Sequence, residues 1–136
     1  MPHPLVHRLS IGLDRSQRDP LSSQIAELIW TEVVEGGLPS GARLPTVRQL
    51  AIGLEVSPRT VDRAYRELER LGVAHSKPGE GTFVSLKPPP EEERRRHRAL
   101  ARLCRETLDS ARELGFDAEE LLDTLRELRT LDEETP

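Results

Sequence analysis

The sequence predicts a mostly α-helical fold with a small β wing: a winged helix-turn-helix domain followed by a two-helix tail. Two amphipathic segments, 46–54 and 57–71, are separated only by a tight turn, which is typical of a helix-turn-helix. A glycine-tipped hairpin at 73–86 follows in the position of a wing. The prolines at 88–90 favour an extended conformation, so we place a boundary there, with domains at 1–87 and 88–136.

The composition fits a small helical protein with a regional charge imbalance. The chain has 136 residues, of which 35% are hydrophobic and 3% aromatic, so its core must consist mainly of Leu, Val, Ile and Ala. The formal net charge of −4 argues against a general nucleic-acid coat. Residues 1–86 hold ten Lys or Arg against ten Asp or Glu, whereas 87–136 hold ten against fourteen. The acidic excess therefore lies in the tail.

Several classes of protein are excluded by what the sequence lacks. Cys104 is the single cysteine, so neither an intramolecular disulfide nor a CxxC metal site can form. No apolar stretch has the length of a signal-peptide core or of a membrane span of about 18 residues, so we expect a soluble, cytoplasmic protein. No GxSxG, GxxxxGK(S/T) or HExxH motif is present, and the histidines are scattered. We therefore expect no enzymatic activity, no metal site and no cofactor.

The N-terminal region predicts a short strand and then a helix. Apolar residues alternate with polar or small ones over 9–13, which indicates a strand. Asp19 and Pro20 supply an N-cap and a first-turn proline for a helix that ends at the glycines 36–37. Trp30 lies off the main stripe of this helix and either joins the core or packs under the tail helices. The stripe itself consists of Ile25, Leu28, Ile29 and Val33.

The helix-turn-helix signals are concentrated in 46–71. Thr46 and Gln49 form a capping box that begins the first helix of the pair. After the turn at 55–57, Ser57 caps the second helix, and Pro58 occupies its first position, where a missing N–H costs nothing. The side chains expected to face the core are Val47, Leu50, Ala51 and Leu54 in the first helix and Val61, Ala64, Tyr65 and Leu68 in the second.

One face of the second helix carries three arginines. Arg59, Arg63 and Arg66 are spaced i, i+4 and i+7, opposite the apolar stripe. N-terminal residues of a recognition helix reach base edges in the major groove of DNA, and an arginine can bind guanine O6 and N7 together. The alternative is a solvated face in which Asp62 pairs with Arg66 and Glu67 with Arg63. The DNA contacts predicted on this helix are Ser57, Arg59, Thr60, Arg63 and Arg66.

The preceding helix offers contacts to the DNA backbone. Arg48 and Arg43 are expected to meet phosphates, although Arg43 is equally compatible with an ordinary surface loop. Thr46 either serves only as a helix cap or also presents its backbone N–H to an anion at the helix N-terminus.

The hairpin is the candidate wing. Lys77, Gly79 and Gly81 are expected to approach the sugar-phosphate wall or the minor groove, since glycine permits close contact with another backbone. Glu80 disfavours a neighbouring phosphate. An ordinary hairpin turn is the alternative.

The tail predicts two helices that cannot enclose a core alone. Gly115 ends the first helix, and Asp117 with Glu120 forms a capping box for the second. We expect these helices to pack on the helix after Pro20, on another subunit, or on both. The leucines expected to form a homodimer interface are Leu100, Leu103, Leu114, Leu121, Leu122, Leu125 and Leu128.

The ordered segments PLSSQIAELI, LPTVRQLA, VSPRTVDRAYRELERLG and GEGTFV, within 20–86, resemble the GntR family of bacterial regulators. The segment SPRTVDRAYRELE and the short tail are similar to the YtrA-type branch of that family. The resemblance implies a homodimeric repressor that binds a palindromic DNA operator. Carried over by position, it implies DNA contacts at Arg48, Arg59, Thr60, Arg63 and Gly81.

Two positions depart from the family pattern. Pro58 stands where many GntR proteins have an arginine, so one common base contact is absent and the usual operator sequence is in doubt. Glu55 fills a turn position often taken by glycine, and we expect a mildly strained backbone there.

Taken together, these features predict a sequence-specific DNA-binding transcriptional regulator. A winged-helix module that binds other proteins and not DNA is the alternative, but such a module would not need an arginine face clear of the core. A small-molecule effector of unknown identity, bound where the tail helices meet the winged domain, stays an open possibility.

Overall fold

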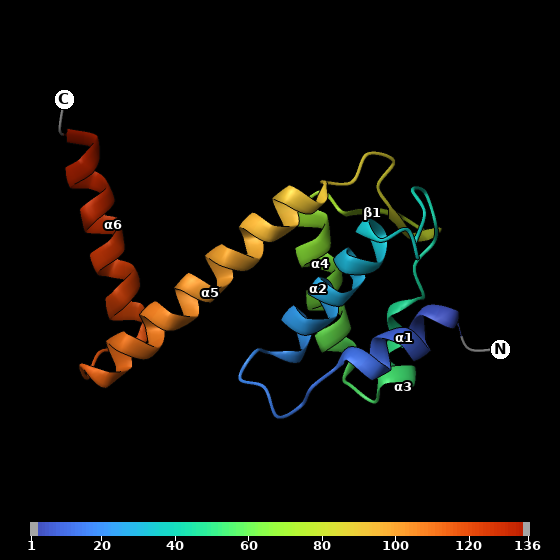
Figure 1. The fold of residues 1–136 in the computed structure, drawn as a ribbon, viewed down its shortest axis with the longest axis horizontal. Coiled ribbons are helices and arrows are strands. Elements are labelled where there is room, and N and C mark those ends of the chain that lie inside the picture. Colours follow the sequence, from blue (N-terminus) through green and yellow to red (C-terminus); the bar gives the residue numbers. More distant parts are fainter. Residues whose placement is uncertain (1–2, 135–136) are drawn as a thin grey trace. The chain divides into compact units, whose positions relative to one another are not determined.

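The structure, a computed structural model, describes residues 3–134. This part of the chain contains six α-helices and a two-stranded antiparallel sheet, in the order α1–α4, β1, β2, α5, α6 (Figure 1). The predicted mostly helical fold with a small β wing is confirmed. The chain divides between Glu92 and Glu93 into two compact units.

The N-terminal segment forms a helix, and the strand predicted there is wrong. α1 spans Pro4–Gly12, and the side chain of His3 accepts a backbone N–H of its first turn at 3.1 Å. Ile11, which belongs to the alternating stretch 9–13, is exposed. The helix buries Leu5, Val6 and Leu9, whose spacing has the period of a helix and begins before the stretch 9–13.

The next helix, α2, spans Leu21–Val34 and is capped differently from the prediction. Its N-cap is Pro20, which offers no side-chain acceptor, so the predicted Asp19 cap is wrong. The carbonyl of Asp19 instead accepts the side-chain amide of Gln24 at 3.0 Å. Trp30 is buried in the core of the first unit, and its indole N–H donates to the Pro89 carbonyl at 3.4 Å.

The helix-turn-helix forms as predicted. α3 spans Val47–Leu54 and begins with the complete capping box of Thr46 and Gln49. α4 spans Pro58–Arg70, with Ser57 as its N-cap and a proline in the first turn. The predicted apolar side chains of α4 are all buried, as are those of α3 apart from the partly buried Val47. In the turn, Glu55 has a left-handed backbone with φ of 56°, as expected from its glycine-like position.

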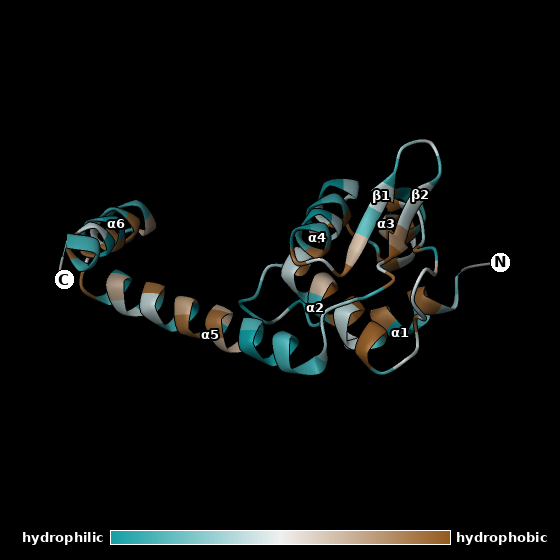
Figure 2. Ribbon diagram, turned by 90° about the horizontal axis from the view of Figure 1, so that it is seen from above, coloured by the Kyte–Doolittle hydropathy of each residue, from teal (hydrophilic) through white to brown (hydrophobic). Residues whose placement is uncertain are grey.

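The wing is larger than the predicted hairpin. β1 spans Ala74–Lys77 and pairs with β2, Gly81–Val84, and both strands lie within the predicted hairpin at 73–86 (Figure 2). The segment 41–44 lines the other edge of β2, an arrangement that sequence analysis missed. The Leu44 N–H donates to the Thr82 carbonyl, and the Val84 N–H donates to the Ala42 carbonyl, each at 2.8 Å. Residues just before α3 are thus part of the wing.

The second unit consists of two helices and buries almost nothing. α5 spans Glu91–Glu113 and α6 spans Ala118–Glu134. The Asp117 carboxylate accepts the Glu120 N–H at 2.9 Å, the predicted cap of the last helix. Figure 2 shows hydrophobic residues recurring along α5 after hydrophilic first turns. Within the described part of these helices only Ala111 is buried, and α6 has no buried residue.

Candidate nucleic-acid interface

The arginine face of α4 is exposed, and two of its side chains are unpaired. Arg59 and Arg63 form no hydrogen bond or ion pair within residues 3–134. Arg66 forms an ion pair with Asp62 at 2.9 Å. The opposite face of the helix lies entirely in the core. The helix therefore presents two guanidinium groups that no described residue of the chain neutralises.

The solvated-face alternative applies to only one of its two proposed pairs. Asp62 does pair with Arg66, but Glu67 does not pair with Arg63. Glu67 instead binds Arg70, with 2.9 Å between Nε of the arginine and Oε2 of the glutamate. This hydrogen bond and the attraction of the Glu67 charge raise the pKa of Arg70.

The N-terminal end of α4 is held in place by hydroxyl groups. The Ser57 hydroxyl oxygen accepts the Thr60 N–H at 3.1 Å, and the two hydroxyls are hydrogen-bonded to each other at 2.8 Å. One of these hydroxyls therefore keeps a hydrogen that the cap does not use. Arg59 lies between these two residues in the first turn of α4, so the residues predicted at the start of this helix are close together along the chain.

The predicted backbone contacts before and within α3 differ in their environment. Arg48 is exposed and has no hydrogen bond or ion pair among the described residues. The Thr46 N–H donates to the side chain of Gln49 at 2.9 Å, so it is already used by the capping box. The Thr46 hydroxyl oxygen accepts the Gln49 N–H at 3.0 Å, which leaves the hydroxyl hydrogen available to an anion.

Arg43 belongs to the wing and is not an isolated loop residue. It lies opposite Phe83 in an antiparallel bridge to β2. A Cβ built on Gly81 would lie 2.9 Å from Nε of Arg43, so a side chain at position 81 would displace the guanidinium. Gly81 also has φ of 129°, which other residues rarely adopt. Conformation is therefore the main reason for glycine here, because the flexible Arg43 side chain can move aside while the backbone angle cannot be relieved in that way.

One face of the wing carries a cluster of basic and aromatic side chains. The Lys77 ammonium lies 4.8 Å from the centre of the Phe83 ring. The ring of His75 stacks on the same phenylalanine with 6.0 Å between centroids. Sequence analysis did not single out His75 or Phe83, although the period of two along the strands places both on the same face as Lys77.

A buried hydrogen bond connects α4 to the segment that precedes α3. The Tyr65 hydroxyl donates to the Pro45 carbonyl at 2.7 Å, and the tyrosine is 4% exposed. Burial raises the pKa of Tyr65, so the phenol stays a hydrogen-bond donor. This bond fixes α4 relative to the residues that link the wing to α3.

Other kinds of site have little support in the described residues. No group of three or more His, Cys, Asp or Glu side chains there could hold a metal ion. None of the helices described has the length and apolar character required to cross a membrane. The exposed basic groups of α3, α4 and the wing are therefore the main functional candidates.

The fold and this surface define a winged helix-turn-helix DNA-binding regulator, and comparisons with known proteins identify its family. Residues 21–84 match the model of the bacterial regulatory proteins of the gntR family. The chain is 36% identical over 111 residues to the HTH-type transcriptional regulator YhcF of Bacillus subtilis, covering 79% of this chain and 88% of that protein. The chain belongs to the GntR family of transcriptional regulators and is not an enzyme.

Two further comparisons cover most of the chain. The HTH-type transcriptional repressor YtrA of Bacillus subtilis is 27% identical over 118 residues, which are 87% of this chain and 91% of that protein. This match confirms the resemblance to the YtrA-type branch. A solved GntR family transcriptional regulator from Listeria monocytogenes is 30% identical, with a TM-score of 0.55 over 85% of this chain and 98% of that one.

Proposed function

We propose that this protein is a homodimeric repressor that binds a palindromic DNA operator, with α4 in the major groove. The observation that carries the proposal is the exposed face of α4, where Arg59 and Arg63 are unpaired while the opposite face is buried. The similarity to YtrA, which is named a repressor, supports the same direction of regulation.

The contacts divide into base recognition and backbone binding. Arg59 and Arg63, together with Thr60, lie at the N-terminal half of α4, the part of a recognition helix that reaches base edges. Arg66 joins them only if the phosphate charge competes with Asp62 for its guanidinium. The residues proposed to bind the sugar-phosphate backbone are Arg43, Thr46, Arg48, Ser57, Lys77, Gly79 and Gly81.

The tail at 88–136 is proposed to form the dimer. Six of the seven leucines predicted for the interface are 44–76% exposed, and Leu121 is partly buried. Helices with so much exposed apolar surface need a partner, and a symmetric dimer supplies the same face from a second copy. Two α4 helices related by such symmetry would read half-sites about 34 Å apart, or a multiple of that distance.

The test begins with DNA fragments of the source genome that are selected by the purified protein. Affinity for a selected two-fold-symmetric site is then measured for the wild type and for Arg63→Ala. We expect Arg63→Ala to lower the affinity by about 1–3 kcal/mol, as for an arginine that contacts a base. Affinity should also fall steeply with salt, because phosphate contacts release counterions.

Arg70→Ala is the matched control for this test. It removes the same charge from the same helix, but Arg70 is already neutralised by Glu67 near the C-terminal end. We expect a small effect that does not depend on the operator sequence. Equal losses in the two variants would show that Arg63 acts only through net charge, and failure to select any fragment would contradict DNA binding itself.

A further inference from the structure

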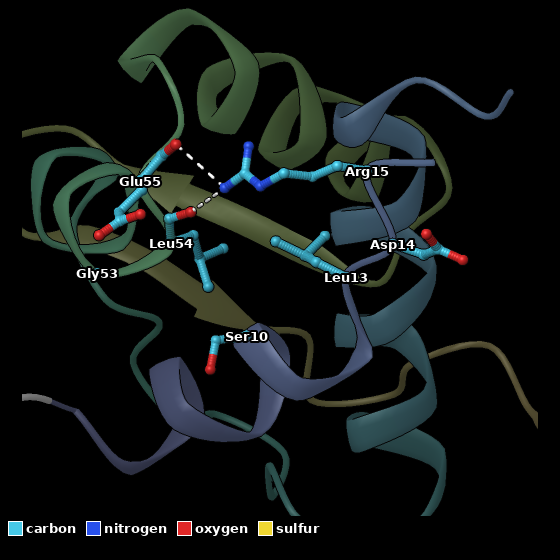
Figure 3. A pocket seen from close by; sticks show the side chains of 7 residues that line it. All are labelled: Ser10, Leu13, Asp14, Arg15, Gly53, Leu54 and Glu55. Atoms are coloured by element: carbon cyan, nitrogen blue, oxygen red, sulfur yellow. Dashed lines mark hydrogen bonds between the residues drawn. The ribbon is translucent and has the colours of Figure 1, made fainter. Parts of the chain in front are cut away.

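A side chain from the loop between α1 and α2 closes the turn of the helix-turn-helix. The Arg15 guanidinium donates to the Leu54 carbonyl at 2.7 Å and to the Glu55 carbonyl at 3.1 Å (Figure 3). These two carbonyls lie at the C-terminal end of α3, 39 and 40 residues away in sequence. Arg15 reaches them along the wall of a pocket of about 510 Å³ that is also lined by Ser10, Leu13 and Gly53.

The turn has a particular need for such a contact. Glu55 is the single non-glycine residue with positive φ in the described chain, and its left-handed conformation is disfavoured for a residue with a side chain. The last carbonyls of a helix have no partner inside the helix, and a positive charge near them is favourable. Arg15 donates to both carbonyls at once. It therefore stabilises the left-handed backbone at Glu55, which is unfavourable for a glutamate.

The residue that precedes Arg15 is held by a buried amide. Gln24, which is 8% exposed, accepts the Asp14 N–H and donates to the Asp14 carbonyl, both at 2.9 Å. The Asp14 carboxylate accepts the Ser16 hydroxyl and N–H, which lowers the pKa of Asp14. The residue before Arg15 is thus fixed at both backbone polar groups, and the arginine starts from a defined position.

We infer that Arg15 is a positioning residue for DNA recognition: it sets the turn that orients α4, without being required to touch DNA. The inference rests on the proposed role of α4 in the major groove. Glu55 is followed two residues later by Ser57, the N-cap of α4, so a change at this turn moves the start of the recognition helix directly. Gln24 of α2 holds the backbone of Asp14, and the next residue, Arg15, holds the turn. The turn is thereby connected to α2.

The experiment uses the full chain and the variants Arg15→Ala, Glu55→Gly and the double variant. We expect Arg15→Ala to weaken operator binding by about fivefold, the size that corresponds to the net contribution of one typical hydrogen bond. In the Glu55→Gly background the same change should weaken operator binding by less than about twofold. Glycine adopts the left-handed conformation without the hydrogen bonds from Arg15. A purely additive pair would overturn the inference.

Hydrogen exchange at a single amide of the turn separates a local effect of Arg15 from a general effect on the fold. The Val56 N–H donates to the Ala51 carbonyl at 3.0 Å and closes the same turn. Its hydrogen exchange should accelerate in Arg15→Ala, while amides in the middle of α2 should stay protected. Unchanged exchange at Val56 would overturn the inference even if the wild type bound no DNA, so this outcome is distinct from failure of the proposed function.

Arg8→Ala is the matched control for charge. Arg8 also comes from the N-terminal region and contacts another element, through an ion pair with Glu32 at 2.9 Å and a hydrogen bond to the Gly37 carbonyl. The substitution Arg8→Ala removes the same charge as Arg15→Ala but leaves the contacts of the turn at Glu55 intact. We expect the Val56 exchange rate to match the wild type and the loss of affinity to stay clearly below that of Arg15→Ala. Equal losses in Arg8→Ala and Arg15→Ala would reduce the effect to net charge and overturn the inference.

Discussion

The proposed dimer can be tested by shortening two leucines of α6. Leu125 and Leu128 lie three residues apart, so they are neighbours on one face of the helix. The double variant Leu125→Ala and Leu128→Ala should weaken the dimer strongly. Alanine has the highest helix propensity, so α6 itself should remain folded, and any effect should come from the lost contact surface.

The magnitude follows from the exposure of the two side chains. Leu125 is 49% exposed and Leu128 is 51% exposed, so about half of each side chain remains to be buried by a partner. Full burial of a leucine contributes roughly 1.5–3 kcal/mol, so the remaining half contributes about 1 kcal/mol. Each position occurs twice in a symmetric dimer. Four positions at about 1 kcal/mol each give a loss of about 4 kcal/mol for the double variant, which raises the dimer dissociation constant by about 1000-fold.

Sedimentation equilibrium over a range of protein concentrations measures this change, and operator binding should weaken with it. Ile11→Ala is the control, because Ile11 is 72% exposed on α1 and lies outside the tail. Its dimer should dissociate as the wild type does. A double variant that dissociates at the wild-type concentration would exclude this face of α6 as the interface.

Two further predictions concern the scaffold of the winged domain. Tyr65→Phe should lower the free energy of unfolding by about 1–2 kcal/mol in urea, because the Pro45 carbonyl loses its donor at 2.7 Å. Because burial raises the pKa of Tyr65, the phenol loses its proton at lower pH in the unfolded state than in the folded state. The free energy of unfolding should therefore be unchanged below about pH 10 and should fall by up to about 1.4 kcal/mol per pH unit above that pH. Tyr65→Phe should lack this slope. Thr46→Ala should cost about 1 kcal/mol of stability through loss of the capping box, whereas Thr46→Ser should stay near the wild type; equal urea midpoints for all three proteins would contradict the role of the cap.

The helix-turn-helix could be predicted because its signals are local. The start of α3 is marked by Thr46 with Gln49, and the start of α4 by Ser57 with Pro58. Both caps form through hydrogen bonds between residues only three positions apart. The apolar spacing of α4 also fixed which side of the helix is exposed, and so which arginines face solvent. The strained turn at Glu55 followed from comparison with a family pattern that favours glycine.

The remaining features depend on contacts that are distant in sequence. The alternation at 9–13 resembles a strand, but packing of Leu5 and Leu9 against the core selects a helix. Nothing in 41–44 indicates a strand, and this segment becomes extended because the edge of β2 offers it hydrogen bonds. Arg15 gave no signal at all, since its two carbonyl partners lie 39 and 40 residues away.

The segment 44–46 connects the wing, α3 and α4 through hydrogen bonds. Leu44 is hydrogen-bonded to β2 of the wing, Pro45 accepts the Tyr65 hydroxyl of α4, and Thr46 caps α3. Three successive residues therefore anchor three different elements, and none of them can shift without moving the others. Arg43 directly precedes this segment, and its backbone is bridged to Phe83 of β2, so its backbone has a defined position relative to α4. In the proposed complex with α4 in the major groove, a wing attached in this way would meet the DNA backbone at a set distance from the bases. Its non-specific phosphate contacts would then constrain the register of α4 on the operator.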